Sequence, residues 1–212
     1  YPACEAGGFV WAYMGPPEKK PLLPRYDVLV REDGTRKVDY YLINSNYLQN
    51  VEGALDTVHA IFLHVDHWSE VKHRIGSIAK PQVRFTETDY GIWQKTYGPD
   101  LTFTELRPLY TYFFMPAGFI RIQINPHVVG HAQKFQSWYV PIDDTHMHSF
   151  QAELVHISGK AAERYREQRD AWSAHARYCA PELAEAVLAG KMRIWDANPD
   201  EVNITWLEDE VA

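Results

Sequence analysis

The pattern of hydrophobic and polar positions divides the chain into a long strand-rich part and a helical part that begins near residue 160. Residues 81–88 and 91–98 flank Asp89-Tyr-Gly91, a turn signature that predicts a β-hairpin. Other runs rich in aromatic and β-branched residues predict strands at 8–14, 37–43, 101–115, 118–125, 134–140 and 146–157. Because most of these strands follow one another without helices between them, we expect an antiparallel sheet.

Helical spacing marks three segments. Residues 161–172 and 181–188 read as helices, the second with Pro181 at its start and Gly190 after its end. A third helix, which comes first along the chain, should start near Asn46, since Asn46 and Gln49 resemble a capping box. The predicted fold class is therefore α+β, an antiparallel sheet with helices packed on one side, in one domain over residues 1–212.

The segment from Glu52 to His64 places two carboxylates and two imidazoles among apolar residues of the third helix. Burying so many ionisable groups is unfavourable without compensation, and a divalent metal ion compensates imidazole and carboxylate groups well. On an ideal helix Glu52, Asp56 and His59 lie within about 60° of one another, whereas His64 lies about 140° from His59. Either a bulge or the end of the helix must separate the two histidines if both bind one ion. Asp56 is placed to accept the second ring N–H of His59.

Two explanations of this segment remain open from spacing alone. The chain has 10 His, so a pair separated by four residues arises readily by chance, and both rings could be satisfied polar groups of the core. Asp143-Asp144 reads as a turn. Other histidine pairs suit ligand or ordinary polar roles equally: His64/His67, His127/His131 and His146/His148. Arginines in or beside strands could anchor an acidic substrate but more often extend to solvent or pair structurally: Arg84, Arg107 and Arg121.

Composition narrows the class of protein. A net charge of −7 without a basic run argues against nucleic-acid binding. No apolar run approaches the roughly 20 residues that span a bilayer, so we expect no membrane segment. Cys4 and Cys179 lack the spacing of a metal site or a disulfide framework, which favours a cytoplasmic protein. The chain starts without Met at a strand and stops where a helix should begin, so we expect a piece of a longer protein.

Three stretches resemble the oxygenase component (alpha subunit) of Rieske-type non-haem iron aromatic ring-hydroxylating oxygenases, in the phthalate-dioxygenase-like branch. Residues 46–64 are similar to the family's iron motif, Asn-x-x-Gln…Glu-Gly-x-x-Asp-x-x-His-x4-His. Val140-Pro-Ile-Asp-Asp-Thr-His146 is similar to a Pro-x-Asp-Asp-Thr-His segment of that branch. Gly8-Phe-Val-Trp-Ala-Tyr-Met-Gly-Pro16 is similar to the stretch that follows the family's Rieske domain. The three matches occur in the family's order.

The resemblance implies an iron(II) bound by a 2-His-1-carboxylate facial triad. His59 and His64 match the histidine ligands, and Asp209 of the late Glu208-Asp209 pair matches the carboxylate. Thr205 and Glu208 resemble a capping box, which would place Asp209 in the first turn of a helix. Asp143 or Asp144 is the alternative carboxylate.

The resemblance also implies the electron route. Asp56 matches the aspartate that links an iron ligand to the Rieske cluster of the neighbouring subunit, usually in a trimer. A Rieske [2Fe-2S] cluster needs a Cys-x-His…Cys-x-x-His set, which this chain lacks. We therefore expect residues 1–212 to be the helix-grip-like catalytic domain alone, without the N-terminal Rieske domain and the extreme C-terminus.

The function that the resemblance implies is activation of O2 at iron and oxygenation of an aromatic substrate, by analogy an aromatic acid. NADH would supply electrons through a separate reductase. The outcome could be a cis-dihydrodiol, a monohydroxylated product or O-demethylation of an aromatic ether. A hypothesis from another class is a helix-grip ligand-binding module without a catalytic metal.

Overall fold

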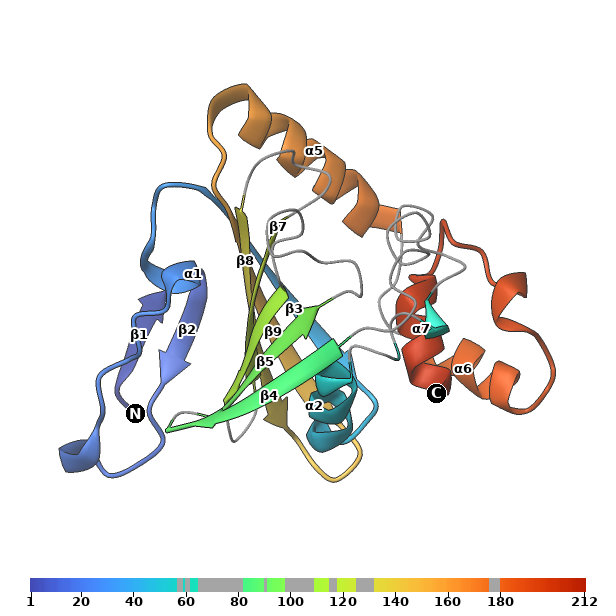
Figure 1. Cartoon of the computed structure of the whole chain (residues 1–212), viewed down its shortest axis with the longest axis horizontal. Coiled ribbons are helices and arrows are strands. Elements are labelled where there is room, and N and C mark those ends of the chain that lie inside the picture. Colours follow the sequence, from blue (N-terminus) through green and yellow to red (C-terminus); the bar gives the residue numbers. More distant parts are fainter. Residues whose placement is uncertain are drawn as a thin grey trace.

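The centre of the fold is a seven-stranded antiparallel sheet (Figure 1). The computed structural model describes residues 1–56, 59, 62–64, 82–89, 91–97, 109–114, 118–124, 132–175 and 180–212. Six consecutive strands form a meander, and the first strand of the sheet pairs with the last one at its edge, in the order β3-β9-β8-β7-β6-β5-β4. The strands are β3 (Thr35–Ile43), β4 (Gln82–Thr88), β5 (Gly91–Tyr97), β6 (Leu109–Phe114), β7 (Gly118–Ile124), β8 (Ala132–Pro141) and β9 (Met147–Val155).

One face of the sheet carries the longer helices. Met147 and Tyr139 point to this face and form a buried cluster with Val51 of α2 (Tyr47–Leu55), against which Trp206 of α7 (Ile204–Val211) packs. Helix α5 (Gly159–His175) joins the same face further along β9, where the Tyr165 hydroxyl donates to Glu153. The layer between the sheet and these helices therefore brings α2, from the first half of the chain, next to α7, from its end.

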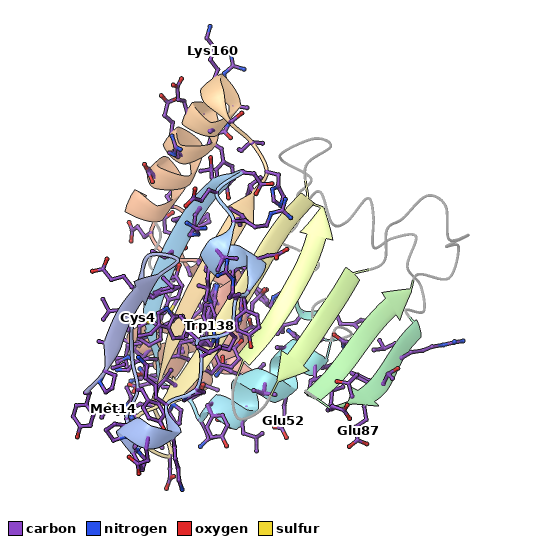
Figure 2. The ribbon with its side chains drawn as sticks, turned by 90° about the vertical axis from the view of Figure 1, so that its left-hand side faces the viewer. Cys4, Met14, Glu52, Glu87, Trp138 and Lys160 are labelled. Atoms are coloured by element: carbon purple, nitrogen blue, oxygen red, sulfur yellow. The ribbon has the colours of Figure 1, made fainter. Side chains whose placement is uncertain are left out.

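The opposite face is covered by a small hairpin and one helical turn. Strands β1 (Ala3–Ala6) and β2 (Phe9–Ala12) pair with each other, and α1 (Asp27–Val30) buries Val28 and Leu29 against Ala152 and Leu154 of β9. Because successive strand residues point to opposite faces, Trp138 lies on this side although Tyr139 lies on the other. Figure 2 views the molecule from the hairpin side, with Trp138 behind the hairpin and α2 behind the sheet.

A separate buried cluster anchors α7. Leu207 is fully buried and packs with Val202, Ala180 and Ala184, the last from α6 (Pro181–Leu188). Two short 3₁₀ turns, Pro17–Lys19 and Ile194–Asp196, complete the described elements. Helix α7 is thus fixed by apolar packing on one side while its other side faces α2 and the sheet.

The predicted fold class is confirmed, with one addition: the short α1 lies on the face opposite the other helices. The hairpin around Asp89 pairs as β4 and β5, and the capping box forms at Asn46. Residues 101–108 of the predicted strand 101–115 lie outside the described residues. The pattern of the sequence did not indicate β1 or α1. Within the described part of the chain, no helix is both long and apolar enough to cross a membrane.

Candidate metal centre

Helix α2 sets the position of the first half of the site. The Asn46 side chain accepts from Leu48 N at 2.9 Å, and its amide donates to the carbonyl of Asp144 at 3.0 Å, which ties the helix start to the β8–β9 turn. The helix ends at Leu55, where Asp56 adopts the non-helical φ −88 and ψ 84. Gln94 of β5, almost fully buried, donates to the Leu55 carbonyl at 2.5 Å. This hydrogen bond satisfies one of the carbonyls that the end of a helix leaves open.

The end of α2 alters the predicted helical geometry. Since Asp56 leaves the helix, the ideal arrangement of Glu52, Asp56 and His59 on one helical face does not form. His64 lies in a bend directly after the helical residues Phe62 and Leu63. The two imidazoles stand edge to face, with ring centroids 5.4 Å apart. The two rings are therefore close enough to approach one ion.

Asp209 joins the two histidines from the other end of the chain. Its Oδ1 lies 3.1 Å from His64 Nε2 and 3.6 Å from His59 Nε2. One ligand atom from each of the three residues lies within 4.8 Å of the others. Ligand atoms at right angles around an ion, each at about 2.1 Å, are about 3 Å apart. The donor set and its spacing thus fit a divalent metal ion bound facially.

The outer nitrogens of both rings have their own acceptors. His64 Nδ1 donates to Glu208 Oε2 at 2.8 Å, and His59 Nδ1 donates to the backbone carbonyl of Asp56. Each ring therefore presents Nε2 to the other and to Asp209. Asp56 accepts the second ring N–H of His59, as predicted, but through its backbone carbonyl; its exposed carboxylate accepts from the His59 backbone N–H at 3.2 Å. Asp56 lies just after the end of α2, and its carbonyl oxygen points toward the ring of His59, three residues on.

Charge within the cluster shifts the pKa values of all three residues. The contact with the Asp209 carboxylate raises the pKa of His59 and outweighs the opposing effect of burial. Burial lowers the pKa of His64, but its hydrogen bonds to Asp209 and Glu208 and their negative charges raise it overall. Burial raises the pKa of Asp209, but the hydrogen bonds and charges of the two imidazoles hold it below its usual value. Without metal, the site therefore favours protonated histidines beside an ionised Asp209.

The start of α7 differs from the prediction. Asn203, not Thr205, is the N-cap, and its side chain accepts from Trp206 N at 3.3 Å. The helix begins two residues earlier because Asn203 can cap while the apolar Ile204 enters the buried cluster. Asp209 consequently lies in the second turn rather than the first.

The alternative candidates do not join the cluster. Asp143 lies in the β8–β9 turn, where the Thr145 backbone N–H and His146 lower its pKa to about 2. The three-residue group that could hold a metal in the described part of the chain contains Asp209, and neither Asp143 nor Asp144. His148 contacts the Tyr40 hydroxyl at 2.7 Å on the other face of the sheet. Arg84 is exposed on β4. His67, His127, His131, Arg107 and the side chain of Arg121 lie outside the described residues.

Two contributors have no local signal in the sequence. Gln94 reaches α2 across 39 residues, and Glu208 reaches His64 across 144. The family resemblance singled out Glu208 only as the neighbour of Asp209. Contacts between such distant positions cannot be read from periodicity.

Known proteins resemble most of the chain. The oxygenase subunit of 3-chlorobenzoate-3,4-dioxygenase from Comamonas testosteroni is 34% identical over 161 residues, which cover 71% of this chain and 35% of that protein. The oxygenase subunit of 5,5'-dehydrodivanillate O-demethylase from Sphingobium sp. is 28% identical over 151 residues, 70% of this chain and 33% of that protein. The chain spans about a third to nearly half the length of the curated relatives it matches.

A solved structure supports the same fold. The structure of a Pseudomonas putida CBB5 NdmA mutant with theobromine aligns with a TM-score of 0.58 at 13% identity, covering 100% of this chain and 57% of that one. No protein-family model matches the sequence. On the relatives and the shared fold together, the chain belongs to the Rieske-type non-haem iron aromatic ring-hydroxylating oxygenases, as the catalytic domain of their oxygenase alpha subunit.

Proposed function

We propose that His59, His64 and Asp209 hold a mononuclear iron(II) ion and that the chain is the catalytic part of a terminal oxygenase in aromatic compound catabolism. The family implies mononuclear non-haem iron. The observation that supports this ligand set is the approach of Asp209 Oδ1 to Nε2 of both histidines. A facial set of three protein ligands leaves adjacent coordination positions open.

The residues of the chain prepare the site in distinct ways. His64 is 2% exposed, so its ring has little freedom, whereas the Asp209 side chain is 42% exposed. Iron(II) in such a triad supplies the redox centre at which O2 is activated for insertion into a nearby substrate. The Asp56 carbonyl and the Glu208 carboxylate hold the outer ring nitrogens, which keeps both Nε2 atoms directed inward.

Asp56 is our candidate for the entry of electrons. Its side chain is exposed and lies next to His59, whose backbone N–H donates to the Asp56 carboxylate. We propose that a Rieske [2Fe-2S] domain preceding residues 1–212 in the whole protein receives electrons from NADH through a separate reductase. In a homotrimer, the cluster of one subunit would meet Asp56 of its neighbour.

The substrate class we propose is an aromatic acid. Dioxygenation joins O2, two electrons and two protons to the ring and gives a cis-dihydrodiol, whereas monooxygenation gives one hydroxyl group and water. The similarity to an O-demethylase subunit supports the second outcome, in which hydroxylation of an aryl methyl ether releases formaldehyde. Product analysis under 18O2 with the full-length protein and its reductase, over aromatic acids and ethers, separates them: two labelled oxygens mean dioxygenation.

The ligand set has a direct test in the protein purified without oxygen. We expect about one iron per chain, and His59→Ala, His64→Ala and Asp209→Ala should lose it. Asp143→Ala and Asp144→Ala, in the β8–β9 turn, are matched controls that should retain it. A chain that binds no iron, with all five variants alike, would instead support a helix-grip ligand-binding module.

A further inference from the structure

We propose that Glu208 is a positioning residue that fixes the metal-binding tautomer of His64. The inference rests on the proposed iron site, but it concerns a residue that does not itself approach the ion. Glu208 Oε2 accepts from His64 Nδ1 at 2.8 Å, on the side of the ring opposite Asp209. Glu208 would influence the iron only by orienting the His64 ring and fixing its proton.

Burial lets this hydrogen bond determine which ring nitrogen of His64 carries the proton. The side chains of His64 and Glu208 are 3% and 7% exposed, so water cannot easily replace either partner. A neutral imidazole carries one ring proton, and the acceptor at one nitrogen determines where that proton resides. If the proton moved to Nε2, the lone pair of Nδ1 would face a carboxylate oxygen at 2.8 Å, a repulsive contact in a buried place. In the metal-free site Asp209 also faces Nε2, at 3.1 Å, so both ring nitrogens carry protons there. Once Asp209 binds an ion, Glu208 is the carboxylate left to accept a ring proton from His64, so that proton would stay on Nδ1 and Nε2 would keep its lone pair for the metal.

Helix α7 holds the ring of His64 at both nitrogens. Glu208 reaches Nδ1, and its neighbour Asp209 lies 3.1 Å from Nε2. The fully buried Leu207, one residue earlier, anchors this turn of the helix in the cluster formed with α6. One rigid element thus supplies a metal ligand and orients another ligand that lies 144 residues away along the chain.

The two histidines differ in the acceptor at Nδ1. The His59 ring, which is partly exposed, donates to the neutral carbonyl of Asp56, whereas the buried His64 donates to a carboxylate. A carboxylate acceptor makes the imidazole a stronger donor to metal than a carbonyl does. The carboxylates of Glu208 and Asp209 together also match the double charge of iron(II). We therefore expect His64 to depend on its partner more than His59 does.

Two variants separate the hydrogen bond from the charge. Glu208→Leu removes both, while Glu208→Gln keeps an oxygen acceptor of similar shape without the charge. Glu210→Leu and Glu210→Gln are matched controls on the same helix, where the Glu210 carboxylate accepts from the Ala180 backbone N–H. Binding of iron(II) is measured by chelator competition without oxygen. The tautomer is measured by 15N NMR of histidine-labelled protein loaded with zinc.

In the wild type, the NMR spectrum should show His64 protonated at Nδ1 and metal-bound at Nε2. Glu208→Leu should lower the affinity for iron about 10- to 100-fold. In any chain that still binds zinc it should also lose the sharp Nδ1 proton signal, because that proton then exchanges with water. Glu208→Gln should keep the signal and bind iron with an affinity between those of Glu208→Leu and wild type. Both Glu210 variants should match wild type in both measurements.

The outcomes separate this inference from the function on which it rests. A wild-type chain without iron affinity refutes the proposed metal site itself. A wild type that binds iron, with Glu208→Leu equal to it in affinity and tautomer, overturns the role of Glu208 alone. If Glu208→Leu does not fold, Glu208→Met, which also lacks a strong acceptor but is closer to Glu in length, replaces it with the same expected loss and the same refuting outcome.

Discussion

The metal-free and metal-loaded proteins should respond to pH in opposite directions. In the metal-free cluster, Asp209 raises the pKa of both His59 and His64, and the histidines in turn lower the pKa of Asp209. The same proton that stabilises the empty cluster blocks the nitrogen that a metal needs. One set of contacts therefore has two effects of opposite sign.

The sign for folding follows from these directions. A histidine with a raised pKa in the folded state contributes stability that is fully present below its unfolded pKa, about 6.5, and is lost as pH rises through the folded value. Asp209, with a lowered pKa, contributes stability that is present above about 3.9 and is lost as pH falls through its folded value. The cluster should stabilise the metal-free protein most between about pH 4 and pH 6.5.

The sign for metal binding is the reverse. Both imidazoles must be neutral to bind, so metal affinity rises with pH until both have lost their protons. Between the two histidine pKa values, each pH unit should change the apparent affinity about 10-fold. Below both values the change should approach about 100-fold per unit, since two protons are then displaced. The raised pKa values place the onset of this loss above that of a free imidazole.

Thermal unfolding of the metal-free protein and zinc competition titrations, each from pH 5 to 8.5, measure the two trends. Asp209→Asn is the control for the stability curve, because removing the carboxylate should flatten the stability trend of the metal-free protein. Stability and affinity that rise together across pH 6–8 would refute the coupling of Asp209 to the histidines. Parallel stability curves for wild type and Asp209→Asn would do the same.

Three further predictions concern the elements around the site. Leu207→Ala should lower the free energy of unfolding by about 2–5 kcal/mol in urea titrations, because it opens a cavity under α7; a loss below 1 kcal/mol would contradict the packing. Asn46→Ala should lower it by about 0.5–2 kcal/mol through loss of the α2 cap, whereas the same change at the exposed Asn44 serves as the control. Asp56→Asn should retain iron but lower turnover with the reductase at least about tenfold in the full-length protein; unchanged turnover would exclude Asp56 from electron transfer.

Local signals in the sequence located much of the fold. The capping box at Asn46 involves residues three apart, and the β4–β5 hairpin depends on the turn at Asp89, so both form where short-range chemistry predicts them. The end of α2 could not be predicted from local signals. Asp56 leaves the helix without a Gly or Pro, and a buried Gln94 from another strand holds the carbonyl before it. Tertiary contacts, rather than helix propensity, account for this boundary.

The candidate site shows the same division. Charge and spacing identified His59 and His64 as a possible pair, but the ideal helix that the sequence suggested would have kept them apart. Asp209 was identified by family resemblance alone, and the N-cap one turn before it was misassigned because Thr205 and Asn203 are both good caps. The contact between Glu208 and His64 depends on how α7 docks, and no local pattern encodes that docking.

This docking also determines how much of the site exists before metal binds. Joining residues 144 apart costs chain entropy on the order of 4 kcal/mol, which a metal bridge alone would have to offset. Here Leu207, Ile204 and Val202 already bury α7 against α6, and the hydrogen bond from His64 to Glu208 closes the same loop without a metal. The free energy of metal binding is then available mainly for displacing protons from His59 and His64. A site that packing has already assembled explains why its ligands can include an exposed carboxylate, Asp209, and still converge on one point.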